Sequence, residues 1–442
     1  MDSPQAPLQL GCWSKLFIVL ILGVAAIAVT LAFWLRSTAD LDAERARAVA
    51  LGVELDWEKL GVTGDRSVQR RTLDEVAKIA ERAKPYDGSS YEWERDPWRA
   101  SAPSDLAGWN SGVDVDLDAA IDRLDGIPAL QIAPGEIAAA RLSHNAKRFV
   151  RGFDDWQRLN TYDAVHVLKR RSLIATGDMS ALADRLVRLA GSGPNLHSIW
   201  GSFSASEAFI NHVLRHRDAL DPRLTAAQAR QLAASLESQL LVVVRCGPAF
   251  WEGALRLPCE EVLRAWNLRL PSLMQYRSLQ DLFQRSGRRA VLARAIDAAA
   301  WVGVNGLPQT PAQVEAMSPG WPQMTPWRVL RDLYGATVDP GGCAHCAGRQ
   351  VGQVHSLTVK WLRQRAYLLL LAADFDGSAW PSDPGDSAGG TLRPILRDGL
   401  VIGAYSFGAD MRDDGGLTRV DWCFPLRAPL GYPRAADPPK IP

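Results

Sequence analysis

Oxygen-bearing side chains and glycines are concentrated between residues 405 and 416, in the sequence YSFGADMRDDGG. Ser406, Asp410, Asp413 and Asp414 are hard oxygen donors, and calcium prefers six to eight such ligands held by a tightly folded backbone. The spacing is not that of an EF-hand. Asp and Gly residues also suit a hairpin turn, where they serve backbone geometry alone. The segment is therefore either a calcium site or a turn.

Two pairs of cysteines are candidates for disulfide or redox chemistry. Cys343 and Cys346 form a C-x-x-C motif with an internal histidine, as in thiol oxidoreductases, where the pair begins a helix after a hydrophobic strand. Here the motif follows VDPGG without a strand pattern, so we favour a structural disulfide or unpaired loop thiols over a metal site or redox chemistry. Cys246 and Cys259 flank a helix-to-helix connection and are a second candidate disulfide.

His212 and His216 lie four residues apart, so on a helix they share a face and could hold a metal ion between them. No HExxH glutamate accompanies them, and arginines crowd the same region, which favours a polar helix face. The chain also lacks a G-x-S-x-G elbow, a phosphate-binding P-loop and a dinucleotide-binding turn. Acyl transfer, nucleotide hydrolysis and hydride transfer therefore lack their usual residues, and we expect no nucleotide ligand.

The overall charge argues against a nucleic-acid partner. Lys plus Arg number 50 and Asp plus Glu number 49, for a net charge of +1, so no basic surplus is available to bind phosphates. Acidic residues dominate residues 105–125, where a solvated face is favoured over cation binding.

Residues 16–35 contain no charged residue and no proline. A helix of this length rises about 30 Å, enough to cross the hydrocarbon core once. Lys15 and Arg36 flank the segment, and Trp13 and Trp34 stand where aromatic rings settle at the two interfaces. These features predict a signal anchor. A cleaved signal peptide is the alternative, because small residues follow in cleavage-site spacing.

Apolar periodicity and helix-start signals place the other elements. Ser180, Thr225 and the Thr310–Pro311 pair are expected to begin helices, and Thr72 with Glu75 forms a capping box. Residues 356–374 predict a helix with a buried face. Residues 400–410 and 419–426 have strand character on either side of the acidic segment.

The predicted fold class is mainly α, with an N-terminal transmembrane helix, an extracytoplasmic helical bundle and a small C-terminal antiparallel β-hairpin. The predicted parts are a cytoplasmic tail (1–15), the transmembrane helix (16–35), a stalk helix and irregular loop region (36–133), a helical domain (134–375), a small β/loop subdomain with the acidic Gly-rich loop (376–426) and a Pro-rich tail (427–442).

The segment at 405–416, preceded by Asp383 and Pro384, resembles the C-terminal end of an uncharacterised group of bacterial single-pass membrane-anchored proteins. Through them it is similar to the C-terminal region of the type II secretion major pseudopilin. The likeness extends loosely over residues 170–424, and only the ending is specific.

This resemblance implies calcium as a cofactor, bound through Ser406 and Asp410 together with Asp413, Asp414 or Asp421. The chain departs from pseudopilins in lacking their N-terminal processing site and in its far larger helical domain. A filament subunit is therefore not expected.

These observations lead to two functional hypotheses. The first is a non-enzymatic periplasmic scaffold or interaction protein, anchored in the membrane by one helix, with envelope protein partners and a role related to secretion. The alternative is a membrane-tethered extracytoplasmic enzyme, either a hydrolase or a thiol redox protein.

Overall fold

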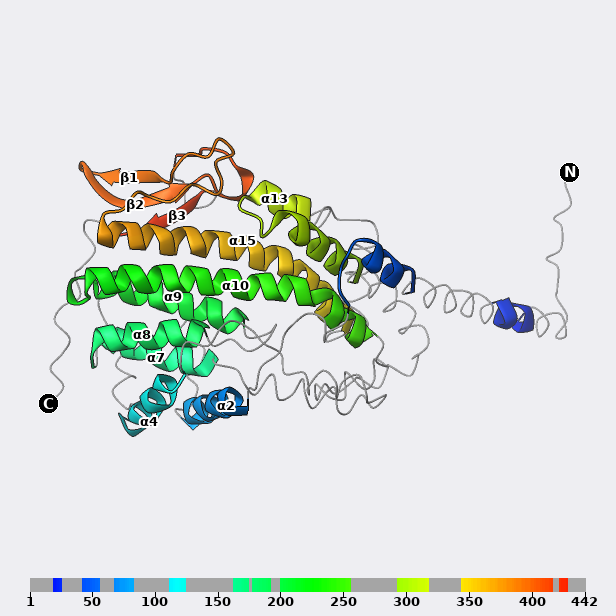
Figure 1. Cartoon of the computed structure of the whole chain (residues 1–442), viewed down its shortest axis with the longest axis horizontal. Coiled ribbons are helices and arrows are strands. Elements are labelled where there is room, and N and C mark those ends of the chain that lie inside the picture. The colour runs from blue at the N-terminus through cyan, green and yellow to red at the C-terminus, as the bar shows by residue number, and fades with distance from the viewer. Residues whose placement is uncertain are drawn as a thin grey trace, which may run out of the picture.

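The computed structural model describes residues 19–25, 42–55, 67–82, 111–124, 162–174, 177–191, 199–255, 292–317, 343–415 and 421–427. This part of the chain is mainly helical and ends in a small antiparallel sheet (Figure 1). The predicted fold class is thereby confirmed in its coarse form.

The labelled helices are α2 (Ser67–Arg82), α4 (Ser111–Asp122), α7 (Tyr162–Ile174), α8 (Met179–Gly191), α9 (Ile199–Arg215), α10 (Pro222–Leu255), α13 (Pro311–Met317) and α15 (Cys343–Asp376), with short 3₁₀ turns η3 (Arg217–Ala219) and η5 (Gly408–Asp410). Residues 19–25, 42–50 and 292–305 are also helical.

The helices are stacked in layers beneath the sheet. The long helices α10 and α15 lie side by side, and the sheet lies along the other side of α15 (Figure 1). Below α10 follow α9, then α8 and α7, and finally α4 and α2 (Figure 1). One hydrophobic core runs through all of these layers, from α2 to the sheet.

Apolar residues at helical spacing explain why α10 and α15 pack together. Leu232, Leu236 and Leu240 recur every fourth residue along α10 and are fully buried. On α15, Leu357 and Trp361 are buried on the face predicted for residues 356–374, so that helix is confirmed. It begins earlier than predicted, at Cys343.

The expected helix starts are correct at one of three positions. Thr310 caps α13, since the amide of Gln313 donates to its hydroxyl over 3.3 Å. The proposed starts at Ser180 and Thr225 are wrong, because aspartates further upstream cap both helices. Asp178 accepts hydrogen bonds from the first turn of α8, and Asp221 does the same for α10.

For residues 36–133 a stalk helix, a helix opening at Thr72 and an irregular loop region were expected. The described residues of this region contain helix 42–50, α2 and α4. α2 begins at Ser67, so Thr72 lies inside the helix and the proposed capping box there is wrong. Its predicted apolar face is nevertheless correct, since Leu73 and Val76 are buried. α4 covers residues for which only a loop was predicted.

Asp118 of α4 lies in an interhelical contact, so the expectation of a solvated face is wrong at this residue, whereas Asp116 and Asp122 are exposed. Asp118 accepts from Arg171 of α7 over 3.0 Å and lies 2.8 Å from a guanidinium nitrogen of Arg185 of α8. Arg185 also forms a bidentate ion pair with Asp122, with hydrogen bonds of 2.9 and 2.8 Å. The hydrogen bond from Arg185 lowers the pKa of Asp122. These pairs fasten α4 to the body of the bundle.

The sheet has three strands in the order β1 (Arg393–Arg397), β2 (Leu400–Ser406) and β3 (Trp422–Pro425), all antiparallel. The predicted pairing of the two strands that flank the acidic segment is confirmed, whereas β1 was missed and the sheet is larger than a single hairpin. Gly403 allows β3 to approach, because a Cβ there would lie 2.7 Å from the carbonyl oxygen of Phe424. Tyr367 of α15 packs on Phe424, with ring centroids 5.2 Å apart, and joins the sheet to the bundle.

Of the predicted transmembrane segment, the described part is residues 19–25, which are helical. No helix among the described residues is long and apolar enough to span a bilayer. The remaining residues of that segment lie outside the described chain.

Candidate functional site

Asp383 is the centre of a polar network beneath the acidic segment. Its carboxylate is fully buried. Oδ1 accepts hydrogen bonds from the Ser406 hydroxyl and from the Gly385 amide, the latter over 2.7 Å. Oδ2 accepts from the Phe407 amide and from Nη1 of Arg393, both over 3.2 Å. Each carboxylate oxygen therefore has two donors, which fills its lone-pair positions.

Arg393, the first residue of β1, supplies the positive charge of this network. Its guanidinium lies 3.2 Å from Asp383, 3.1 Å from Asp386 and 3.7 Å from Asp413. The guanidinium carbon also stacks 3.7 Å from the centroid of the Phe407 ring. One planar cation thus joins two carboxylates of the turn at 383–386 to a third in the acidic segment.

The turn that carries Asp383 and Asp386 is held by its own backbone. The Ala388 amide donates to Asp386 over 2.8 Å and, with further help from Arg393, lowers the pKa of that carboxyl. Gly385 sits directly against η5, because a Cβ there would lie 2.9 Å from the amide nitrogen of Gly408. The turn and η5 are therefore in close contact.

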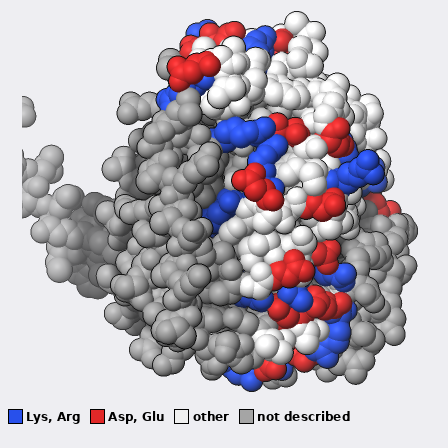
Figure 2. Space-filling model, turned by 90° about the vertical axis from the view of Figure 1, so that its left-hand side faces the viewer, with Lys and Arg blue, Asp and Glu red and all other residues white. Residues whose placement is uncertain are grey.

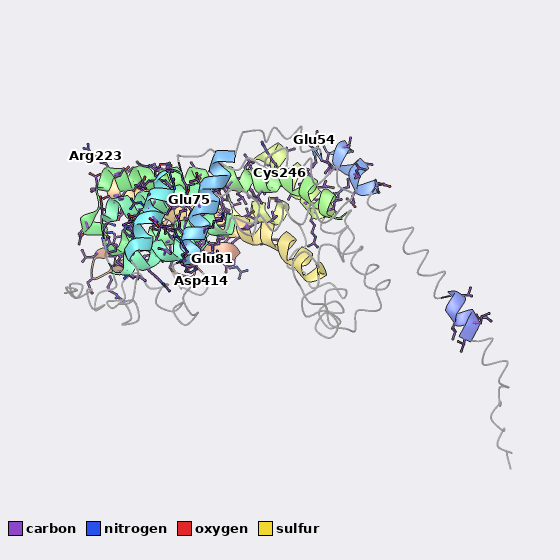
Figure 3. The ribbon with its side chains drawn as sticks, turned by 90° about the horizontal axis from the view of Figure 1, so that it is seen from below. Glu54, Glu75, Glu81, Arg223, Cys246 and Asp414 are labelled. Atoms are coloured by element: carbon purple, nitrogen blue, oxygen red, sulfur yellow. The ribbon has the colours of Figure 1, made fainter. Side chains whose placement is uncertain are left out.

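The four predicted metal ligands occupy different environments. Ser406 is buried and donates to Asp383, while Asp413 is half exposed and accepts from the Tyr405 hydroxyl over 3.2 Å. Asp410 and Asp414 are exposed, and Asp414 lies at the edge of the body (Figure 3). In the described part of the chain, no group of three or more His, Cys, Asp or Glu side chains is placed to hold a metal ion.

Sequence reasoning missed Arg393 and Asp386, and it included Asp383 only through the resemblance. The available signal was the D-P-G-D sequence at 383–386, whose Asp and Gly residues are typical of a side-chain-stabilised turn. Arg393 carried no such signal, because its role depends on the unpredicted strand β1.

Three cysteines of the two candidate pairs lie in described long helices, Cys246 in α10 and Cys343 and Cys346 in α15. Cys246 is buried in α10 (Figure 3), and burial raises the pKa of its thiol to about 11, so it is protonated and a poor nucleophile at neutral pH. Its predicted partner Cys259 lies outside the described residues. Cys343 and Cys346 form the first turn of α15, and the expectation that they sit in a loop is therefore wrong.

His212 is a core residue, so the expected polar helix face is wrong at this position. The side chain is fully buried in α9. Its Nε2 lies 2.9 Å from the carbonyl oxygen of Met179 and must donate to it, which leaves Nδ1 to accept from the Ser172 hydroxyl over 2.8 Å. Burial lowers the pKa of His212 to about 3. His216 is tied in the same way, with Nε2 2.7 Å from the Ser172 carbonyl oxygen.

This serine–histidine pair has the connectivity of a nucleophile and its base, but its burial denies access to a substrate. His212 and His216 each donate a ring N–H to a backbone carbonyl. Through these hydrogen bonds the two histidines join α7, α8 and α9. The neutral imidazole is a structural component of the core.

The chain matches no protein-family model, no curated protein and no solved structure.

The network around Asp383 and Arg393 has a structural role. It joins the first strand, the turn at 383–386 and the acidic segment into one unit. Its polar groups are engaged with each other, which suits a rigid support for the surface of the sheet.

Proposed function

We propose that this protein is a bacterial inner-membrane protein, anchored by one N-terminal helix, whose extracytoplasmic helical domain acts as a scaffold or interaction module of the envelope. The observation that carries the proposal is the exposure of the apolar helix at residues 19–25. Its large side chains are between 52% and 67% exposed: Val19, Leu20, Ile21, Leu22 and Val24. Lipid is the environment that such a continuous apolar surface fits best.

The segment that follows the proposed anchor supports a fixed attachment. Residues 42–55 pack against helix 292–305 through a small separate core that includes Ala48, Leu292 and Ile296. Arg47 adds ion pairs to Glu44 and to Asp297 of the second helix. The expected stalk helix therefore packs, in its described part, against the domain.

The distribution of charge supports a scaffold. On the face in Figure 2, basic and acidic side chains alternate, without a large area of one sign. Many of these groups are paired between helices, for example Arg217 with Asp374 at 2.5 Å and Arg230 with Asp376. Paired charges fix the helix positions, and they offer no basic surface for a nucleic acid.

The likeness to the pseudopilin C-terminal region remains part of this proposal. It is supported in its coarse outline, since a long helix leads into antiparallel strands on either side of the acidic segment. We infer from it a role related to secretion, with envelope proteins as partners.

One observation favours the alternative of a thiol redox protein. Cys343 and Cys346 form the first turn of α15, and the amide groups at a helix start stabilise a thiolate. Titration of accessible thiols in the full-length protein, under oxidising and reducing conditions, tests this. A C-x-x-C pair that cycles between dithiol and disulfide supports the redox function, and thiols that stay unchanged refute it.

The anchor is tested by expressing the full-length chain with a C-terminal tag. We expect it in the membrane fraction, resistant to carbonate extraction, at its full mass, with the tag accessible to protease only after the outer membrane is opened. Replacing Leu20 and Leu22 together by Asp should release it. A shortened, carbonate-soluble product would identify a cleaved signal peptide and refute the anchor.

A further inference from the structure

The C-terminal acidic cluster, defined here as Asp383, Asp386 and Asp413, adjoins Ser406 through Asp383 and shares Asp413 with the residues through which the resemblance implies a calcium ion. We propose that the guanidinium of Arg393 takes the position of that cation, so that the sheet and its acidic segment fold without a divalent metal. The proposal concerns this subdomain and does not depend on the function proposed above.

The first argument is that the buried ligands are already used. Both oxygens of Asp383 have two donors each, among them Nη1 of Arg393 at 3.2 Å. The Ser406 hydroxyl donates to Asp383 and accepts from the Gly408 amide over 3.2 Å. Calcium needs six to eight oxygen ligands; in this arrangement the Asp383 carboxylate has no free lone pair to give, and the Ser406 hydroxyl has one.

The second argument is the position of Arg393. Its three nitrogens face the three carboxylates of the cluster, at 3.1 to 3.7 Å, so it satisfies several acids at once as a metal ion does. Its other surface is covered by the ring of Phe407, with the guanidinium carbon 3.7 Å from the ring centroid. The guanidinium is thus held by carboxylates at its edge and by an aromatic ring on one face.

The third argument is the close packing of the turn that carries Asp383 and Asp386. Gly385 packs so closely on η5 that a single added carbon would lie 2.9 Å from Gly408. A Cβ on Gly390 would lie 2.4 Å from Oδ2 of Asp386. The remaining negative charge is met by backbone amides, which donate to each carboxylate of the cluster.

Hydrogen exchange of the β2 amides (residues 400–406), measured by mass spectrometry on the full-length protein in detergent, tests the proposal. For the wild type we expect the same protection in 5 mM calcium and in excess chelator. If calcium bound here and were present at 100 times its dissociation constant, exchange through local unfolding would be about 100-fold slower than in chelator. Such a slowing would overturn the proposal.

The variant Arg393→Met removes the charge while keeping most of the side-chain length. We expect exchange in β2 to become at least about 10-fold faster, whereas Arg397→Met, at the exposed end of the same strand, leaves it unchanged. Wild-type protection in Arg393→Met would refute the proposal. If that variant does not fold, the comparison of the wild type in calcium and in chelator still decides the proposal.

Discussion

Mild acid should weaken this fold through His212. The ring is fully buried and hydrogen-bonded as a neutral imidazole, between the Ser172 hydroxyl and the Met179 carbonyl. Arg215, the last residue of its own helix, and the adjacent His216 both disfavour a positive charge on His212. The unfolded chain therefore takes up a proton on this histidine at a higher pH than the folded chain does.

The size of the effect follows from the pKa of His212, which burial lowers from 6.5 to about 3. Between these two values only the unfolded state is protonated, so stability is complete above pH 6.5 and decreases as the pH falls. Each pH unit in this window costs about 1.4 kcal/mol. Lowering the pH from 7.5 to 5 should thus cost about 2 kcal/mol from His212, and His216, whose pKa is also lowered by burial, acts in the same direction.

Urea unfolding of the full-length protein in detergent, followed by tryptophan fluorescence at pH 7.5 and at pH 5, measures this loss. His212→Gln keeps a neutral donor and acceptor, so the loss between the two pH values should shrink by about 2 kcal/mol, whatever its stability at pH 7.5. His166→Gln, on the neighbouring α7, is the control and should retain the wild-type loss. An unchanged pH dependence in His212→Gln would show that this histidine is not the buried neutral group described above.

Three further substitutions test the packing by urea unfolding in the same detergent. Asp178→Ala should cost about 1 kcal/mol because it removes the cap of α8, whereas Ser180→Ala should cost clearly less. Arg171→Met should cost about 2 kcal/mol because it removes two charge-assisted hydrogen bonds from Asp118 on α4, which keeps its ion pair with Arg185; the matched change Arg82→Met, in an exposed pair, should cost less than about 1 kcal/mol. Gly385→Ala should destabilise the C-terminal sheet, and wild-type hydrogen exchange in β2 of this variant would contradict the close contact with η5.

The mainly helical fold could be predicted because its long helices carry a continuous apolar period. In α15, Leu357, Trp361 and Leu368 recur on one face and are buried there, which is a signal contained within the segment itself. The strands β2 and β3 could be predicted for the same reason, because each is a short apolar run and a Gly-rich turn separates the two.

The elements that were missed depend on partners far away in sequence. α4 reads as a solvated acidic loop until Arg171 and Arg185, more than 50 residues later, neutralise it. β1 contains Pro394, which is unusual inside a sheet and is tolerated here on an edge strand. Because β1 was not predicted, nothing in the sequence placed Arg393 next to the acidic residues. The sequence therefore indicated an acidic segment but not the cation that pairs with it.

The docking of residues 42–55 on helix 292–305 limits how the domain can move under the proposed anchor. Six residues separate position 35, where the predicted anchor ends, from position 42, and even fully extended they reach about 20 Å. Helix α10 alone, at 34 residues, is about 50 Å long. Glu54 lies at one end of the body and Arg223 at the other (Figure 3). A connection this short would keep the end of the domain near Glu54 close to the lipid surface. A partner in the same membrane would then bind at that end, and a periplasmic partner at the end near Arg223.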